Sequence, residues 1–155
     1  VLEEHHLTPF RQLEGDWSAQ SGYLAVMQLT GQALPTGLLV ANDQMALGAM
    51  QALHQMGVAV PAEVSVVGYD DTADSAWYQP PLTTVRQDMR HLGERSVQWL
   101  TGQLEQPGRQ ALLPPFATDL VVRASTAAPR AAKRLAHPIA TELRRLAQQL
   151  DNDVP

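Results

Sequence analysis

Residues 35–71 read PTGLLVANDQMALGAMQALHQMGVAVPAEVSVVGYDD and carry the clearest structural pattern in the chain. Two short apolar runs, Leu38–Ala41 and Val64–Gly68, have the continuous hydrophobic character of strands buried on both faces of a parallel sheet. Between the runs, apolar side chains recur at helical spacing at Ala46, Ala49, Met50, Leu53 and Met56. Gly57 follows them and predicts the end of that helix. The stretch therefore predicts a strand–helix–strand unit.

Further elements are predicted upstream of this unit. Ser18–Leu29 has helical spacing, with Asp16 or Ser18 near its N-cap. Before it, Leu7–Leu13 is a weak extended segment that Pro9 interrupts.

Downstream of the unit, Leu82–Val85 is predicted to be a short strand and Thr118–Arg123 a final one. Residues 86–104 predict a helix, whose inward side chains are expected to be Met89, Leu92, Val97 and Leu100. Because apolar strands alternate with helices, the chain is predicted to be an α/β protein with an open, mostly parallel sheet. Such sheets bind ligands beyond the carboxyl ends of their strands, so the loops there are the first candidates for a site.

The composition excludes several classes of protein. The chain has 155 residues and a mass of 16.9 kDa, with 45% hydrophobic and 17% charged residues, as is typical of a folded globular chain. The absence of Cys excludes a disulfide scaffold, a thiolate metal site and Cys catalysis. No run approaches the roughly 18 apolar residues of a membrane span. The first ten residues, VLEEHHLTPF, lack the pattern of a signal peptide.

The charge is distributed unevenly along the chain. Residues 1–122 contain 5 Lys and Arg against 13 Asp and Glu, a balance of −8, which disfavours binding to a phosphate backbone. Residues 123–155 contain 6 against 3, a balance of +3. This basic tail is either a DNA-binding patch or, in the interpretation we favour, the solvated face of a helix.

Polar side chains follow both predicted strands of the central unit. Asn42 comes directly after the first strand and Asp70 after the second, while Trp17 opens the upstream helix. Carboxylates and amides can hydrogen-bond the hydroxyls of a sugar, and an aromatic ring can pack against its C–H face. Each residue has a structural alternative: Asn42 as a helix cap, Asp70 with Asp71 as turn residues, and Trp17 as core. Their convergence at equivalent strand ends favours a sugar site.

The residues carry no positive signal for catalysis or for a metal. Asp70 and Asp71 could be an acid–base pair, but adjacent residues on an extended chain point in opposite directions and would not flank one bond. The chain has no Gly-rich phosphate loop, GxSxG elbow or HExxH motif. Its five His form no ligand set that spacing can identify. We therefore expect no enzyme activity, no cofactor and no metal site.

The C-terminal segment has a different pattern. Its apolar residues Ile139, Leu143, Leu146 and Leu150 are spaced 4, 3 and 4 apart, as in a coiled-coil seam. Pro138 is compatible only with the first position of this helix. The Ala- and Pro-rich stretch that begins at Ser125 is interpreted as a linker. The helix either pairs with another chain, which we favour, or docks on its own domain.

Four segments resemble one family of proteins: DWSAQSGY at 16–23, PTGLLVANDQMALGAMQAL at 35–53, SVVGYDDTADSAWYQPPLTTVRQDMRHLG at 65–93 and the leucine-bearing tail. Together they are similar to the lactose/galactose-repressor family of transcriptional regulators. The resemblance implies a periplasmic-binding-protein-like (type I) core of two α/β subdomains, with an inducer sugar bound between them. It also implies an N-terminal headpiece that binds operator DNA, with an affinity that falls when the sugar binds.

The resemblance assigns roles to individual residues. Trp17 would stack on the sugar, Asn42 and Asp70 would hydrogen-bond it, and Gln87 would line the pocket. Met89 stands where a member of the family has Phe, so the apolar wall of the pocket is changed. The dimer interface would include Leu47, Asp74, Trp77 and Tyr78. The tail resembles a tetramerising helix that most of the family lacks.

The resemblance also implies an incomplete core. Residues 1–124 would be a partial effector-binding core: 1–85 mainly in the C-terminal subdomain, 86–117 crossing into the N-terminal subdomain and 118–124 a return strand. Residues 125–137 would be the linker and 138–151 the oligomerisation helix. The expected function is the sensing and self-associating portion of a cytoplasmic, sugar-responsive repressor, with a galactoside-like effector and no membrane partner. Operator DNA would be bound only through a headpiece that this chain lacks. The alternatives are a standalone dimerising fragment and a non-regulatory sugar-binding protein.

Overall fold

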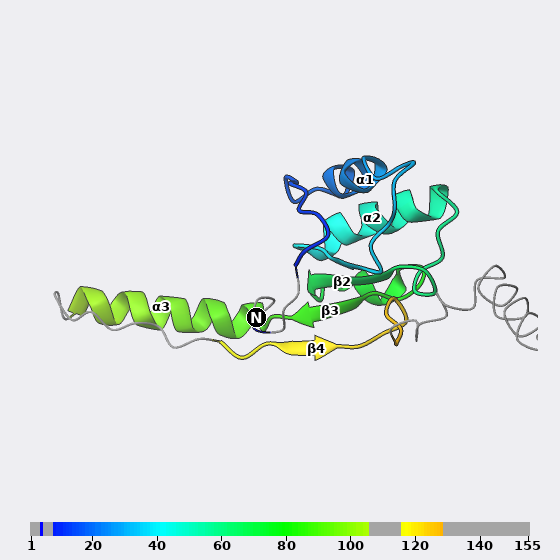
Figure 1. Ribbon diagram of the computed structural model, residues 1–155. Coiled ribbons are helices and arrows are strands. Elements are labelled where there is room, and N and C mark those ends of the chain that lie inside the picture. The colour runs from blue at the N-terminus through cyan, green and yellow to red at the C-terminus, as the bar shows by residue number, and fades with distance from the viewer. Residues whose placement is uncertain (1–3, 5–7, 106–115, 129–155) are drawn as a thin grey trace, which may run out of the picture.

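A single four-stranded sheet forms the centre of the molecule in the computed structural model, which describes Glu4, residues 8–105 and residues 116–128 (Figure 1). The strands are β1 (Gly37–Leu39), β2 (Ser65–Asp70), β3 (Thr83–Arg86) and β4 (Asp119–Val121), in that order across the sheet. The first three are parallel, and β4 runs antiparallel to β3. The predicted α/β class and mostly parallel sheet are confirmed. The carboxyl ends of β1, β2 and β3 consequently meet at one edge.

Two helices, α1 (Ala19–Met27) and α2 (Asp43–Gln55), lie on the same side of the sheet (Figure 1). The predicted apolar stripe of α2 faces the sheet, where Ala46, Ala49, Met50 and Leu53 are buried with Val64, Val66 and Leu82. Met56 is only half-buried because it caps the helix, and Gly57 follows it with a φ of 72°, as a C′ glycine does. The core of this body is thus a layer of helix packed on one face of the sheet.

The two helices pack closely because glycines lie at their contact. A Cβ added to Gly48 of α2 would lie 1.7 Å from the backbone oxygen of Ala19. A Cβ added to Gly22 of α1 would lie 2.0 Å from the backbone oxygen of Met45. Backbone touches backbone at both points, so no larger residue fits without moving a helix.

The helix predicted to begin at Arg86 begins three residues later, as α3 (Met89–Glu105), because Arg86 is the last residue of β3. The expectation that its apolar residues point inward is wrong. Leu92 is half-buried, and Met89, Val97 and Leu100 are more than half exposed. The helix projects beyond the sheet, and of the described residues only the segment before β4 lies against its first turns (Figure 1). Val97 and Leu100, farther along the helix, therefore stay exposed.

Residues 8–13, where a weak extended segment interrupted by Pro9 was expected, form neither helix nor strand and lie outside the sheet. One other predicted boundary differs from the structure. Ser125, expected to open a linker, is fully buried; its hydroxyl donates to the Val66 carbonyl at 2.6 Å and accepts from the Thr83 amide at 2.7 Å. The folded body thus includes Ser125. Residues 129–137 of the expected linker lie outside the described residues.

None of the helices in the described part of the chain combines the length and the hydrophobicity that crossing a membrane requires.

Candidate functional site

The predicted site residues lie where elements end at the carboxyl edge of the sheet. Trp17 precedes Ser18, whose side chain accepts a hydrogen bond from the Ser21 amide and caps α1. Asn42 caps α2, accepting from the Met45 amide at 2.8 Å. Asp70 is the last residue of β2. Local capping chemistry and the end of a buried strand therefore bring these residues to neighbouring positions.

Trp17 and Asn42 are joined directly. The side-chain amide of Asn42 donates to the backbone oxygen of Trp17 at 3.0 Å. The Trp17 side chain is 65% exposed, which rules out the alternative that it belongs to the core. The alternative that Asn42 caps its helix is confirmed, and the cap leaves the second amide hydrogen and one oxygen lone pair of Asn42 available to another partner.

Asp70 and Gln87 form a second pair. The Gln87 Nε2 donates to Asp70 Oδ1 at 2.9 Å, and Asp70 Oδ2 receives no hydrogen bond from any residue the structure describes. The backbone of Asp70 has a φ of 112° and that of Asp71 a φ of 56°, both in the region that side chains disfavour. Two successive positive φ values turn the chain sharply, so the expectation of an extended chain through Asp70 and Asp71 is wrong. The two carboxylates bind different partners.

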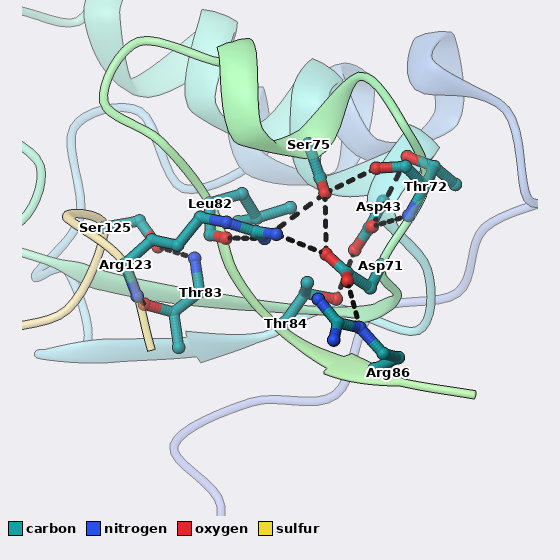
Figure 2. A network of polar contacts seen from close by, with 10 residues as sticks. All are labelled: Asp43, Asp71, Thr72, Ser75, Leu82, Thr83, Thr84, Arg86, Arg123 and Ser125. Atoms are coloured by element: carbon teal, nitrogen blue, oxygen red, sulfur yellow. Dashed lines mark hydrogen bonds and ion pairs between the residues drawn. The ribbon is translucent and has the colours of Figure 1, made fainter. Parts of the chain in front are cut away.

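Asp71 is the centre of an ion-pair cluster, which we define as Asp71, Arg86 and Arg123 (Figure 2). Arg86 Nε donates to Asp71 Oδ2 at 2.6 Å, and Arg123 Nη2 donates to Asp71 Oδ1 at 2.6 Å. The Asp71 side chain is only 7% exposed. Its burial would raise the pKa of the carboxyl, but the hydrogen bonds from Arg123 and Arg86 outweigh burial and lower that pKa. Because the pKa is lowered in the folded state, the cluster stabilises the protein at neutral pH. That contribution is lost as the pH falls through the lowered pKa.

A second carboxylate, Asp43, is buried completely at the start of α2. Its Oδ2 accepts from the Thr72 amide at 2.9 Å and its Oδ1 from the Thr84 hydroxyl at 2.6 Å (Figure 2). Tyr78 donates to the backbone oxygen of Asp43 at 3.2 Å, and burial together with the nearby Asp43 carboxylate raises the pKa of Tyr78. Asp43 therefore ties the start of α2 to β3 and to the loop after β2.

These carboxylates show what sequence reasoning missed. The sequence pattern predicted no distant partner for Asp43, and it left Asp71 as a turn residue or as half of an acid–base pair with Asp70. The side-chain oxygens of Asp43 bind residues 29 and 41 positions away, and the two arginines that bind Asp71 lie 15 and 52 residues away, although the Ser75 hydroxyl, four residues away, also donates to Asp71 Oδ1 at 3.2 Å. No local pattern predicts such pairs. The one signal is Gly68, where a Cβ would lie 2.3 Å from Asp43 Oδ1, so that a glycine inside a strand marks a close approach.

Met89, the fifth predicted ligand-binding residue, is the first residue of α3 and is 53% exposed. It follows Gln87 by two residues. Direct hydrogen bonds join the other four residues in two pairs, Asn42 with Trp17 and Asp70 with Gln87.

The residues expected at a dimer interface lie on the outer side of α2 and the loop before β3. Leu47 and Trp77 are exposed, and with Met50 and His54 they border a groove of about 350 Å³. Asp74 is exposed as well. Tyr78, by contrast, is buried, and its hydroxyl donates a hydrogen bond to the backbone oxygen of Asp43.

Two further expectations concern the tail and metals. The helix expected over Ile139, Leu143, Leu146 and Leu150 lies outside the described residues. Within residues 8–105 and 116–128, no three His, Asp or Glu side chains cluster as a metal site would require.

Comparison with known proteins places the chain in a family. Residues 2–126 match the model of the periplasmic binding protein-like domain. The lactose operon repressor of Escherichia coli (strain K12) is 47% identical over 154 residues, which are 96% of this chain and 41% of that protein. The lactose operon repressor of Klebsiella pneumoniae is 48% identical over 114 residues, 72% of this chain and 31% of its own length. The chain thus spans less than half the length of these relatives.

Solved structures agree with the sequence comparison. The crystal structure of the lac repressor dimer bound to operator and the anti-inducer ONPF has a TM-score of 0.73 and 50% identity, covering 82% of this chain and 44% of that chain. The lac repressor bound to ONPG has a TM-score of 0.71 and 50% identity, covering 81% and 38%. The chain therefore belongs to the family of periplasmic binding protein-like domains and is a homologue of the lactose operon repressors.

Proposed function

We propose that this chain is the effector-sensing and self-associating portion of a sugar-responsive transcriptional repressor of the cytoplasm. The observation that carries the proposal is the arrangement at the carboxyl edge of the sheet. There Asp70 keeps a carboxylate oxygen without a hydrogen bond from the described residues, beside Gln87. The Trp17 ring is exposed at the same edge, and the Trp17 backbone oxygen accepts a hydrogen bond from the Asn42 side chain. These groups supply the acceptors and the flat apolar surface that a sugar needs.

A galactoside is the effector we propose. The relatives with 47% and 48% identity are lactose operon repressors, and similar solved structures hold ONPG or ONPF. Trp17 would stack on the ring, Asn42 and Asp70 would bind its hydroxyls, and Gln87 and Met89 would line the pocket. Because Met89 is flexible and unbranched, we expect it to accommodate substituents of a galactoside with little selectivity.

The sugar proposal predicts that Asp70→Asn and Trp17→Ala each weaken ONPG binding by roughly 10- to 100-fold, since each removes a principal contact. Isothermal titration calorimetry on the protein encoded by the complete reading frame measures this. Glu94→Gln is the matched control, because it makes the same acid-to-amide change at an exposed carboxylate of α3 that, among the described residues, pairs with Arg90 alone. Unchanged affinity in both site variants would refute the assignment, and turnover of ONPG would favour an enzyme instead.

Self-association is the second part of the proposal. Leu47 and Trp77 leave apolar surface exposed along the groove on the outer side of α2, and a second copy of the chain would cover it. The similar lac repressor structure bound to operator is a dimer. Asp74 and Tyr78 belong to the same face. The helix proposed over residues 138–151 would join dimers into tetramers through its leucine seam.

Equilibrium sedimentation tests both contacts. We expect Leu47→Glu to lower the mass toward the monomer, because a buried, unpaired charge opposes association. Removing residues 138–151 should halve the mass of a tetramer and leave the dimer. Ala62→Glu, which adds the same charge at an exposed site outside the groove, should leave the mass unchanged. If either test variant keeps the oligomer mass of the unmodified protein, the corresponding contact is not used.

A further inference from the structure

The ion-pair cluster of Asp71, Arg86 and Arg123 contains the immediate chain neighbours of two residues of the proposed sugar site. Asp71 follows Asp70 in the chain, and Arg86 precedes Gln87. The two pairs therefore form successive cross-links between the end of β2 and the end of β3: Gln87 to Asp70 at 2.9 Å, and Arg86 to Asp71 at 2.6 Å. One cross-link belongs to the site, and the other holds the same two backbones together next to it.

The cluster also attaches the segment that returns through β4. Arg123 comes two residues after β4, and its guanidinium donates both to Asp71 and, at 2.8 Å, to the carbonyl of Leu82 just before β3 (Figure 2). A single carboxylate thus connects the end of β2 with β3 and with the strand antiparallel to it. The Asp71 and Arg123 side chains are 7% and 18% exposed, so water screens their attraction only weakly.

The backbone at this point has to be held in place. Asp70 has a φ of 112° and Asp71 a φ of 56°, conformations that persist in non-glycine residues only where the surroundings impose them. Asp70 has one bond from Gln87 among the described residues, whereas Asp71 accepts from two arginines. Asp71 is therefore the more firmly held of the two carboxylates, and the Thr72 amide directly after it is held by Asp43 Oδ2 at 2.9 Å.

We propose that Asp71 is a positioning residue for effector binding: with Arg86 and Arg123 it fixes the strained turn that aims Asp70, and with it Gln87, at the sugar. The inference rests on the proposed function in taking Asp70 as a sugar ligand. Asp71 does not contact the sugar in this scheme, since the two arginines occupy both of its oxygens.

Asp71→Asn tests the charge without disturbing the backbone, because Asn tolerates the left-handed conformation as well as Asp does. In the protein from the complete reading frame, we expect ONPG affinity to fall on the order of tenfold. Arg86→Gln should weaken binding in the same direction and will fold, because the Arg86 side chain is 53% exposed. Arg86→Lys should restore most of the affinity. The double variant of Asp71→Asn and Arg86→Gln should bind no more weakly than Asp71→Asn alone.

Ser125→Ala is the matched structural control. Ser125 also ties the returning segment to β2 and β3, through Val66 and Thr83, but nearer the start of those strands. We expect Ser125→Ala to lower the thermal midpoint and to leave ONPG affinity unchanged. If Asp71→Asn and Arg86→Gln behave in the same way as Ser125→Ala, the cluster only stabilises the fold and the proposal is overturned.

A crystal structure separates this inference from the proposed function. In Asp71→Asn, or in Arg86→Gln if that variant alone folds, the distance from Gln87 Nε2 to Asp70 Oδ1 should open beyond about 3.5 Å. A distance that stays at 2.9 Å would overturn the positioning role whatever the ligand is. If the unmodified protein does not bind ONPG, the galactoside proposal fails, and this distance still decides the role of Asp71.

Discussion

Replacing Gly48 by Ala should destabilise the protein by about 3 kcal/mol, among the largest effects that one methyl group can have. The added Cβ would lie 1.7 Å from the backbone oxygen of Ala19 and 2.8 Å from the backbone nitrogen of Tyr23. Both atoms belong to α1, so no rotamer change can relieve the overlap and the whole helix must move away from α2.

The displacement should also weaken sugar binding, because α1 follows Trp17 and α2 begins beside Asn42. Moving the helices apart strains the 3.0 Å bond between the Asn42 amide and the Trp17 backbone oxygen. Chemical denaturation and ONPG titration on the protein from the complete reading frame measure the two effects. Gly37→Ala is the control, since its Cβ would meet nothing closer than 3.9 Å and should change stability by no more than about 0.5 kcal/mol. Equal stability of the two variants would disprove the close contact of the helices.

Replacing Asp43 by Ala should cost about 3 kcal/mol or more. The substitution leaves the buried Thr84 hydroxyl and the half-buried Thr72 amide without their acceptor and opens a cavity at the start of α2. It also removes the only side-chain tie that the described residues provide between the start of α2 and β3. We expect unfolding at lower denaturant and, in the protein that remains folded, weaker ONPG binding.

Two further variants sharpen the Asp43 experiment. Asp119→Ala removes an exposed carboxylate from β4 and should alter the free energy of unfolding by no more than about 0.5 kcal/mol. Asp43→Asn keeps the shape and one acceptor oxygen, so it should lie between the wild type and Asp43→Ala. A loss for Asp43→Ala as small as that for Asp119→Ala would mean that the buried bonds contribute nothing net.

Much of the central unit was predictable because its signals are local. The β1 and β2 strands, the apolar stripe of α2 and Gly57 at its end depend on neighbours within a few residues, and the structure confirms them. The predicted burial of both strands on both faces is wrong for β1, where Leu39 is 84% exposed. The inward face predicted for α3 failed for the opposite reason. An amphipathic pattern predicts that Val97 and Leu100 can be buried, but burial requires another element, and no described element packs there.

The same distinction between local and long-range signals applies to the candidate site. The residue types at the strand ends were visible in the sequence, because a parallel sheet brings the carboxyl ends of its strands together. Three features were not visible in the sequence: the order of the strands, the pairing of Asp70 with Gln87 and the exposure of Trp17. Those features depend on which segments meet after folding.

Periodicity, caps and turn residues by themselves therefore determine an α/β chain with polar residues at two strand ends. The roles of Asp43 and Asp71 were decided only by tertiary structure. Each looked like an ordinary polar residue at the start of a helix or in a turn. Each is a buried carboxylate with two partner residues that lie between 15 and 52 positions away in the chain. Local chemistry fixes what a residue can bind, whereas the packing of distant segments decides which partner it meets and whether water remains beside it.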